Sequence, residues 1–331
     1  MTGTTIAPRS QTAMLAATIG APGEIELGET ALPEPAPDEV RVRLEGCGVC
    51  ASNLPPWEGR PWFQYPMAPG ALGHEGWGRI DRLGSRVTGF EIGERVGLLS
   101  QHAYAQFDVA PAAAVVRLPD KLDHVPFPAE PLGCALNIFR RSAIRPGQTV
   151  AIVGIGFLGA LLTQLASRAG ARVLAISRRP FALRTARRMG AAEAIPLGNE
   201  PGAIVEQVSR LTNKGMCEVV IEAVGKQVAL DFAGELTAER GRLLIAGYHQ
   251  DGLRQVNMQL WNWRGLDVIN AHERDPRVYL RGMREAVAAV ASGRLNPTPL
   301  YSHRYPLSRL ADALNATRER PDGFMKALIE L

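Results

Sequence analysis

Hydrophobic and polar positions change their spacing about midway along the chain. Up to Val116, short apolar stretches alternate with Gly and Pro, and the segment 39–45 alternates strictly between apolar and charged residues. Strict alternation is typical of a half-buried antiparallel strand. From Thr149 onward, short apolar runs alternate with amphipathic segments of helical length. We therefore expect a β-rich part followed by a part in which strands and helices succeed one another.

The second part contains six apolar runs that are predicted strands, at 150–153, 172–177, 194–196, 217–222, 242–246 and 266–270. Helices are expected between them, including 181–189 and 204–211, with Gly190 as a C-terminal cap. Further predicted helices cover 127–143, 279–292 and 307–318, and returning strands are predicted at 302–307 and 327–331. The predicted fold class is α/β, with a doubly wound parallel sheet beside a β-rich domain.

Glycines follow the first of these strands in the spacing G-x-G-x-x-G, at Gly154, Gly156 and Gly159. The first permits a tight turn, the second lets a pyrophosphate approach the backbone, and the third lets the helix pack closely. Backbone N–H groups of Phe157, Leu158 and Gly159 would then bind the phosphates. A charge-free helix or membrane span is the alternative for this segment, but the strand-like start and the fixed glycine spacing favour a dinucleotide site.

The end of the second strand indicates which dinucleotide is bound. NAD-binding proteins have an acidic residue there, whereas this chain has Ser177 followed by Arg178 and Arg179. A serine does not repel a 2′-phosphate, and guanidinium groups bind phosphate through paired hydrogen bonds. We expect NADP to be preferred over NAD, although a solvated basic helix start is the alternative. Later strand ends should contact the nicotinamide half of the cofactor, at Ala223, Val224, Gly247 and Tyr248.

The β-rich part and the segment after it carry side chains that bind metals, at Cys50, His74, Glu75, Glu130 and Cys134. Thiolate, imidazole and carboxylate groups together suit Zn²⁺. Cys47 and Cys50 could instead form half of a structural zinc site, but such a site needs a second pair of this kind, which the chain lacks. They could also form a redox pair, but a thioredoxin-like motif would need a different surrounding fold. Single cysteines and histidines are more often core residues. The residues alone therefore leave a catalytic zinc as an open hypothesis.

Taken in order, these segments resemble the medium-chain dehydrogenases/reductases. The similarity is greatest to the zinc-dependent alcohol dehydrogenase-like group, in its sorbitol and threonine dehydrogenase branch. It extends from about Met14 to Leu331 and rests on 48–52, 73–75, 130–132, the glycine turn and 302–307. The resemblance implies a GroES-like catalytic domain over 1–138 and 272–331. It also implies a Rossmann domain over 139–271.

The resemblance also implies roles for individual residues. Cys50 and His74 would be zinc ligands, Glu75 would bind the ion directly or lie just behind, and Glu130 would complete the shell, with Cys134 as its rival. Ser52 matches the hydroxyl that passes a proton between the zinc-bound oxygen and the cofactor ribose. Substrate contacts are expected from Asn53, Trp57 and Glu130.

The chain departs from the pattern of the group at several positions. Asn53 replaces the usual aspartate, and its amide oxygen can still accept the ring N–H of His74. Pro55 stands where a histidine often ends the proton relay. The segment 96–111 lacks the cysteines that hold a structural zinc, so we expect one zinc per chain.

The expected function is hydride transfer between NADP(H) and a secondary alcohol or ketone. Polar Asn53 and Glu130 beside Trp57 favour a polyol, a sugar-like alcohol or an amino-polyol as substrate. One alternative is a zinc-free quinone or enone reductase of the same superfamily, and another is a non-catalytic nucleotide-binding paralogue. His249 is either a catalytic group or a polar loop residue, and the polar loop at 272–275 has no assigned role.

Length and composition agree with these expectations. The 331 residues are enough for two domains, and 46% apolar with 21% charged residues describes a soluble globular protein. The net charge of +4 is not gathered into a block, so no nucleic-acid partner is expected, and neither is a membrane. Residues 1–10 show no signal-peptide pattern, so a cytoplasmic location is expected. An exposed edge strand at 266–270 would pair with its twin in a homodimer or homotetramer.

Overall fold

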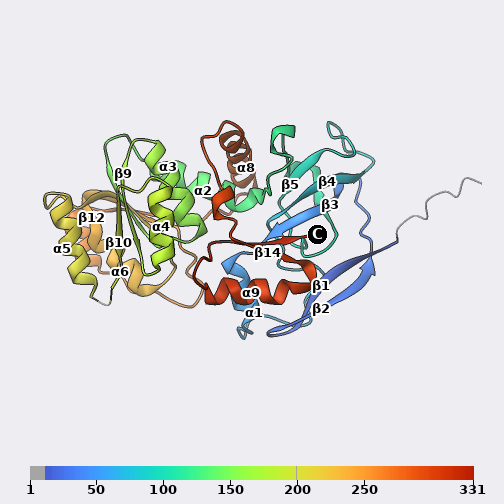
Figure 1. Ribbon diagram of the computed structural model, residues 1–331, viewed down its shortest axis with the longest axis horizontal. Helices are drawn as coiled ribbons and strands as arrows, with labels where there is room; N and C mark the ends of the chain where they lie inside the picture. Colours follow the sequence, from blue (N-terminus) through green and yellow to red (C-terminus); the bar gives the residue numbers. More distant parts are fainter. Residues whose placement is uncertain (1–11, 199) are drawn as a thin grey trace, which may run out of the picture. The chain divides into compact units, whose positions relative to one another are not determined.

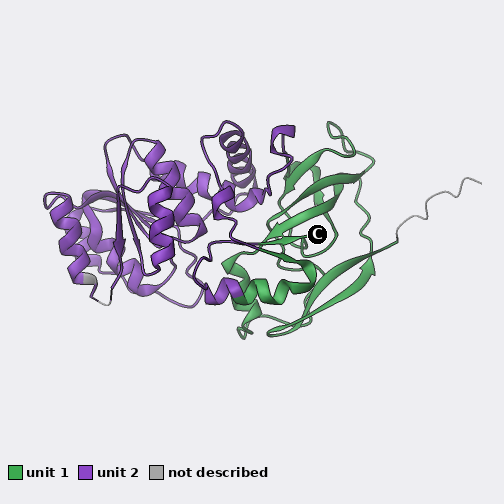
Figure 2. Cartoon of the chain, viewed as in Figure 1, with its two compact units in different colours: residues 1–117, 304–315, 328–331 green, residues 118–303, 316–327 purple. Residues whose placement is uncertain are grey.

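The computed structural model describes residues 12–198 and 200–331 (Figure 1). Residues 1–10, which carry the expectation about a signal peptide, lie outside the described residues. Contacts within the chain divide it into two compact units (Figure 2). Unit 1 holds the described part of 1–117 together with 304–315 and 328–331, and unit 2 holds 118–303 and 316–327.

Unit 1 is built on a sheet centred on β3 (Glu39–Gly48), which pairs antiparallel with β4, β6 and β15. The strand order is β14-β15-β3-β4-β5-β7, with β6 on β3, and β1 pairs with β2 in a separate hairpin. The remaining strands of this part are β1 (Ala13–Ala21), β2 (Glu24–Ala31), β4 (Gly76–Leu83), β5 (Arg95–Leu98), β6 (Phe107–Pro111), β7 (Val115–Arg117), β14 (His303–Pro306) and β15 (Ala327–Glu330). The helix α1 (Leu54–Trp57) is a single turn after β3.

The alternation at 39–45 correctly indicates a strand, but the side expected to face solvent is partly covered. Val40 and Val42 are fully buried, as expected for the apolar face. Arg41 on the other face is also buried, because its guanidinium lies 2.6 Å from Asp81 and 3.2 Å from Glu34. A buried arginine is tolerated where carboxylates pair with it. The alternation therefore identifies the strand but does not show which face is exposed to solvent.

Unit 2 contains a parallel sheet in the order β10-β9-β8-β11-β12-β13, as expected for a doubly wound fold (Figure 1). Its strands are β8 (Thr149–Val153), β9 (Arg172–Ser177), β10 (Glu193–Pro196), β11 (Cys217–Glu222), β12 (Thr237–Ile245) and β13 (Asp267–Asn270). The helices that lie wholly in unit 2 are α2 (Ala129–Ser142), α3 (Phe157–Arg168), α4 (Pro180–Arg188), α5 (Pro201–Leu211), α6 (Gln227–Leu236), α7 (Met258–Arg264) and α8 (Pro276–Ala291). The helix α9 (Leu310–Glu319) begins in unit 1 and ends in unit 2.

The two units differ from the domains implied by the resemblance in where α2 and α8 are placed. Both helices belong to unit 2. They approach closely because each has a glycine at the contact: a Cβ on Gly133 would lie 2.7 Å from the Met283 nitrogen, and one on Gly282 would lie 2.6 Å from the Gly133 carbonyl. An Arg140–Glu285 ion pair at 3.0 Å joins the same two helices. Among the described residues, none of the helices combines the length and the apolar character that a membrane crossing requires.

Candidate metal centre and dinucleotide turn

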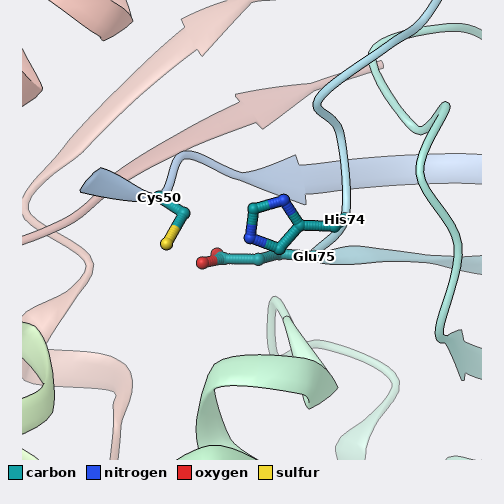
Figure 3. A group of neighbouring side chains, drawn as sticks. All are labelled: Cys50, His74 and Glu75. Atoms are coloured by element: carbon teal, nitrogen blue, oxygen red, sulfur yellow. The ribbon is translucent and has the colours of Figure 1, made fainter. Parts of the chain in front are cut away.

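Cys50, His74 and Glu75 come together at one end of the sheet in unit 1 (Figure 3). One ligand atom from each lies within 4.8 Å of the others. The sheet explains this meeting, because β3 ends near Cys50, β4 begins just after Glu75, and Cys47 pairs with Gly76 in the antiparallel register. The pairing of β3 with β4 thus brings Cys50 close to His74 and Glu75, which are distant from it along the chain.

The donor set in this cluster fits a zinc ion. A thiolate, an imidazole and a carboxylate are the protein ligands that Zn²⁺ takes in catalytic sites, where three side chains leave a position for the substrate. Glu75 is fully buried, and a buried carboxylate is stable only when it is paired or binds a cation. The cluster therefore has both the chemistry and the burial of a metal centre.

The ring of His74 is oriented by a backbone carbonyl. Its Nδ1 lies 2.9 Å from the carbonyl oxygen of Leu72, so Nδ1 carries the hydrogen and Nε2 presents its lone pair for metal binding. Asn53 donates its amide to the same carbonyl at 3.0 Å. The expectation that the Asn53 oxygen accepts the His74 ring N–H is thereby corrected, because Leu72 is the acceptor and Asn53 acts one step further away.

The oxygen of Asn53 has two other donors. It lies 3.2 Å from the backbone nitrogen of Cys50 and 3.0 Å from the hydroxyl of Tyr104. Tyr104 is fully buried, and burial raises its pKa well above its usual value, with a further contribution from Cys47, Glu75 and Cys50. The hydroxyl therefore stays protonated and donates to Asn53. Sequence reasoning did not identify Tyr104, because it lies far from the ligands along the chain and in no motif.

A glycine makes room for the Glu75 carboxylate. A Cβ added at Gly48 would lie 1.8 Å from Glu75 Oε2 and 3.0 Å from its Cδ. The Gly48 nitrogen also donates to the Glu75 carbonyl at 3.2 Å. Gly48, the glycine of the Gly-Val-Cys segment, thus matters for the metal centre, because any side chain at this position would collide with the Glu75 carboxylate.

The other predicted residues of the catalytic site lie on several different elements. Ser52 lies in the one-turn helix η1 (Ala51–Asn53) that directly follows Cys50. Trp57 is 3% exposed and donates its indole N–H to Asn315 at 3.1 Å, as a core residue of unit 1 does. Glu130 and Cys134 lie on α2 in unit 2, so the completion of the zinc shell by either one stays a prediction.

The glycine turn after β8 has the geometry of a dinucleotide-binding turn. Gly154 has φ of +99°, and a Cβ on Gly159 would lie 2.0 Å from the Gly154 carbonyl oxygen, so both positions require glycine for the fold itself. A Cβ on Gly156 would meet nothing within 4 Å. Packing therefore does not explain Gly156, and the close approach of a phosphate to this glycine stays a prediction. Phe157 and Leu158 then open α3, whose first N–H groups face this turn.

The two arginines after β9 have different environments. The Arg178 side chain is exposed, whereas Arg179 donates from Nη1 to the Phe324 carbonyl at 2.7 Å and from Nη2 to the Ile155 carbonyl at 3.3 Å. Burial lowers the pKa of Arg179, and the positive charge of Arg320 lowers it further. Ser177 accepts the backbone N–H of Arg179 at 3.3 Å. Both guanidiniums are predicted to bind phosphate, but that of Arg179 already donates hydrogen bonds to two backbone carbonyls.

The predicted contacts with the nicotinamide half lie on two loops at the carboxyl ends of β11 and β12. Ala223 and Val224 follow β11, and Gly247 and Tyr248 follow β12. Val224 is 45% exposed and Tyr248 is 53% exposed. Exposed apolar side chains at strand ends suit the face of a flat ring, but the contact of these residues with a nicotinamide stays a prediction.

Comparison with known families and proteins identifies two regions of the chain. Residues 36–120 match the family model of the alcohol dehydrogenase GroES-like domain. Residues 158–289 match the family model of the zinc-binding dehydrogenase.

Relatives match most of the chain. An alcohol dehydrogenase from Rhizobium meliloti (strain 1021) is 30% identical over 72% of this chain and 77% of that protein. Sorbitol dehydrogenase from Gallus gallus is 25% identical over 92% of this chain and 93% of that protein. The crystal structure of a putative zinc-binding dehydrogenase from Sinorhizobium meliloti 1021 bound to NADP aligns with a TM-score of 0.84 and 26% identity, covering 97% of this chain and 100% of that one.

Proposed function

Because the chain belongs to the zinc-dependent alcohol dehydrogenase-like medium-chain dehydrogenases/reductases, it is an NAD(P)-dependent alcohol dehydrogenase, and we propose its cofactor preference and substrate class. The proposed reaction transfers a hydride between NADP(H) and a secondary alcohol or ketone, with a polyol or sugar-like alcohol as substrate. The observation that carries the proposal is the convergence of Cys50, His74 and Glu75. A zinc-free quinone or enone reductase has no use for such a cluster.

Each residue of the metal centre has a defined task in this proposal. Cys50 and His74 hold the ion, and Glu75 binds it directly or neutralises its charge from behind. Zinc, when bound, polarises the alcohol oxygen and lowers its pKa. Ser52 accepts the released proton and passes it on. Asn53, being buried and hydrogen-bonded on both sides of its amide, fixes His74 and Cys50 through Leu72 and the Cys50 backbone rather than contacting the substrate.

The preference for NADP is supported by the end of β9. Ser177 puts no negative charge there, and the exposed Arg178 is placed to bind a 2′-phosphate. Arg179 supports the glycine turn by its bond to the Ile155 carbonyl and contributes its positive charge. The NADP bound in the Sinorhizobium meliloti structure is consistent with this preference.

The substrate class is supported by the relatives, several of which are named sorbitol dehydrogenase. Another relative, from Pseudoalteromonas atlantica, is named 2-dehydro-3-deoxy-L-galactonate 5-dehydrogenase, a name that, like sorbitol dehydrogenase, refers to a sugar-derived molecule. We propose that this chain oxidises one secondary hydroxyl of such a molecule.

Steady-state rates of the zinc-loaded protein test both parts of the proposal. With NADP⁺, kcat/KM is expected to be about tenfold or more above that with NAD⁺, because a 2′-phosphate gains a charge-assisted hydrogen bond. Arg178→Ala should reduce this ratio, whereas Arg187→Ala, which removes an exposed arginine of α4, should leave it unchanged. A panel of polyols and straight-chain alcohols tests the substrate class, and a preference for hexanol over sugar alcohols would refute it.

We further propose that the protein forms a homodimer through β13. This strand ends the sheet of unit 2, and apolar side chains gather near it along the chain: Leu253 is 99% exposed, Trp263 88%, Met258 52% and Val268 37%. An exposed edge strand bordered by apolar side chains pairs readily with a second copy. Association of such dimers into a tetramer is compatible with the same contact.

Placing a charge on this edge is expected to separate the protomers. In Val268→Lys, a lysine would be desolvated at the strand pair, so the molar mass measured by light scattering should fall to that of a single chain. Ile92→Lys changes an equally apolar residue, 67% exposed in unit 1, and should keep the native mass. A wild-type protein that is already monomeric would refute the proposal.

A further inference from the structure

The loops that follow β11 and β12 are both hydrogen-bonded to one buried residue, Glu222. Glu222, at the end of β11, is fully buried. Its Oε1 accepts the backbone N–H groups of Val224 at 2.7 Å and Gly225 at 2.8 Å. Its main-chain oxygen accepts those of Ala246 and Gly247, both at 2.8 Å. Every one of these bonds fixes a backbone group in the loops that carry the proposed dinucleotide contacts.

The imidazole of His249 also contacts this carboxylate. Nε2 of His249 lies 3.0 Å from Glu222 Oε2, and its Nδ1 lies 2.8 Å from Nε of Arg254. A guanidinium is always charged and only donates hydrogen bonds, so Nδ1 must be the acceptor. The ring is then neutral, with its hydrogen on Nε2, which donates to Glu222. The His249 side chain is 14% exposed, which leaves little of it in contact with water.

Arg254 connects His249 to the loop that follows β11. Its Nη2 donates to the Gly225 carbonyl at 3.2 Å and forms an ion pair with Asp251. Asp251 in turn lies 2.5 Å from the ammonium of Lys226. A single network of hydrogen-bonded side chains therefore runs from β11 through both loops.

The two loops also touch backbone to backbone. A Cβ on Gly247 would lie 2.2 Å from the Gly225 nitrogen, and one on Gly225 would lie 2.6 Å from the Tyr248 carbonyl. The backbones of the two loops therefore lie in close contact. Val224 and Tyr248 stand exposed above this rigid base.

We propose that neutral His249 is a positioning residue for these dinucleotide-binding loops, and that its protonation loosens them and weakens cofactor binding at acid pH. This inference rests on the proposed function, in which Val224, Gly247 and Tyr248 contact the dinucleotide. It assigns His249 no part in the chemical step, because its ring nitrogens are occupied by Glu222 and Arg254.

The charges around the ring explain why protonation acts as a switch. Glu222 faces Nε2 from β11, Arg254 and Asp251 lie on the loop of His249 itself, and Lys226 lies on the loop after β11. A second ring hydrogen would point at the N–H of Arg254, so that two positively charged donors would face each other. The bond between His249 and Glu222 survives as an ion pair. The hydrogen bond between His249 and Arg254 is lost. Because Arg254 is then displaced, its hydrogen bond to the Gly225 carbonyl is lost as well.

Titration of the protein with NADH, followed by fluorescence, tests this inference. NADH is chosen because the 2′-phosphate of NADPH itself titrates near pH 6. As the pH of the titration is lowered from 8 to 5, the Kd of the wild type should rise on the order of tenfold, because a second ring hydrogen on His249 would displace the Arg254 donor. In His249→Gln, an amide can donate to Glu222 and accept from Arg254 without titrating. This variant should bind within about threefold of the wild type at pH 8, with a Kd that no longer depends on pH.

His124→Gln is the matched control, because it removes an exposed histidine of the same unit and should keep the pH dependence of the wild type. A His249→Gln variant with an unchanged pH dependence, or a wild type whose Kd is flat, overturns the inference while the proposed function stands. Failure of both NADH and NADPH to bind at every pH overturns the proposed function and the inference together. A purely structural histidine would change the melting temperature of the variant without changing the pH dependence of Kd.

Discussion

Replacing Cys50 by serine, or His74 by glutamine, is expected to remove zinc from the protein and to lower the rate of alcohol oxidation by about 10³-fold or more. These two residues supply two of the three ligand atoms that lie within 4.8 Å of one another. Neither replacement side chain reproduces the charge or geometry of the lost ligand, so the remaining atoms do not form a catalytic zinc site. Elemental analysis of the purified variants and their rates with NADP⁺ measure the two effects directly.

Thiol labelling provides an independent measure of the same site. Cys50 and Cys134 are partly exposed, whereas Cys47 and Cys217 are fully buried, and burial raises the pKa of Cys217 to about 12. Iodoacetamide should therefore label Cys50 and Cys134 in metal-free protein, and added zinc should protect Cys50. Protection of Cys134 together with Cys50 would identify Cys134, rather than Glu130, as the ligand that completes the shell.

Two outcomes would contradict the zinc mechanism. One is a Cys50→Ser variant that turns over alcohol at the rate of the wild type, and the other is wild-type protein that contains no zinc after purification in its presence. His124→Gln serves as the control for His74→Gln, since both remove an imidazole but only one removes a ligand atom. Unchanged melting temperatures of the metal-free variants would show that the lost activity does not come from unfolding.

The sequence predicted the sheet of unit 2 well because its strands are short apolar runs bounded by polar segments. The predicted strands at 172–177 and 217–222 coincide with β9 and β11. The predicted start of β12 at Arg242 is late, since the strand begins at Thr237. An irregularity explains the difference: the pairing of β12 with β11 shifts register near Arg240, which has φ of +55°. A distortion of this kind leaves no periodic signal in the sequence.

The metal ligands could be identified from the sequence because side-chain chemistry restricts them to a few residue types. The groups that position these ligands could not be identified from the sequence. They are a backbone carbonyl at Leu72, a hydroxyl at Tyr104 that is distant along the chain, and the missing side chain of Gly48. Any residue type offers a carbonyl, so the sequence does not mark Leu72. The role of His249 was undecided for a similar reason, since its partner Glu222 becomes a neighbour only when β11 and β12 lie side by side.

Gly48→Ala is expected to weaken zinc binding by about 100-fold, although Gly48 offers no ligand atom. The added Cβ would lie 1.8 Å from Glu75 Oε2, a distance that no relaxation of the methyl group alone can relieve. The carboxylate must move, and Glu75 is fully buried, so the space around it is already filled. Competition with a chromophoric chelator measures the zinc affinity.

The control must separate this local clash from the general effect of replacing a glycine. Gly28→Ala serves this purpose, because Gly28 lies in β2 of the same unit and an added Cβ there meets nothing within 4 Å. Its zinc affinity should equal that of the wild type. Equal affinities for Gly48→Ala and the wild type would show that the Glu75 carboxylate is not held where zinc binding requires it.

A double-mutant cycle with Glu75→Ala shows whether the effect of Gly48→Ala passes through this carboxylate. Glu75→Ala alone should weaken zinc binding, because it removes one of the three clustered ligand groups. Once the carboxylate is gone, the alanine at position 48 has room, so adding Gly48→Ala should cost little more. The two changes are then strongly non-additive, as expected for residues in direct contact. Additive losses would instead mean that Gly48→Ala disturbs the end of β3, and with it Cys50, independently of Glu75.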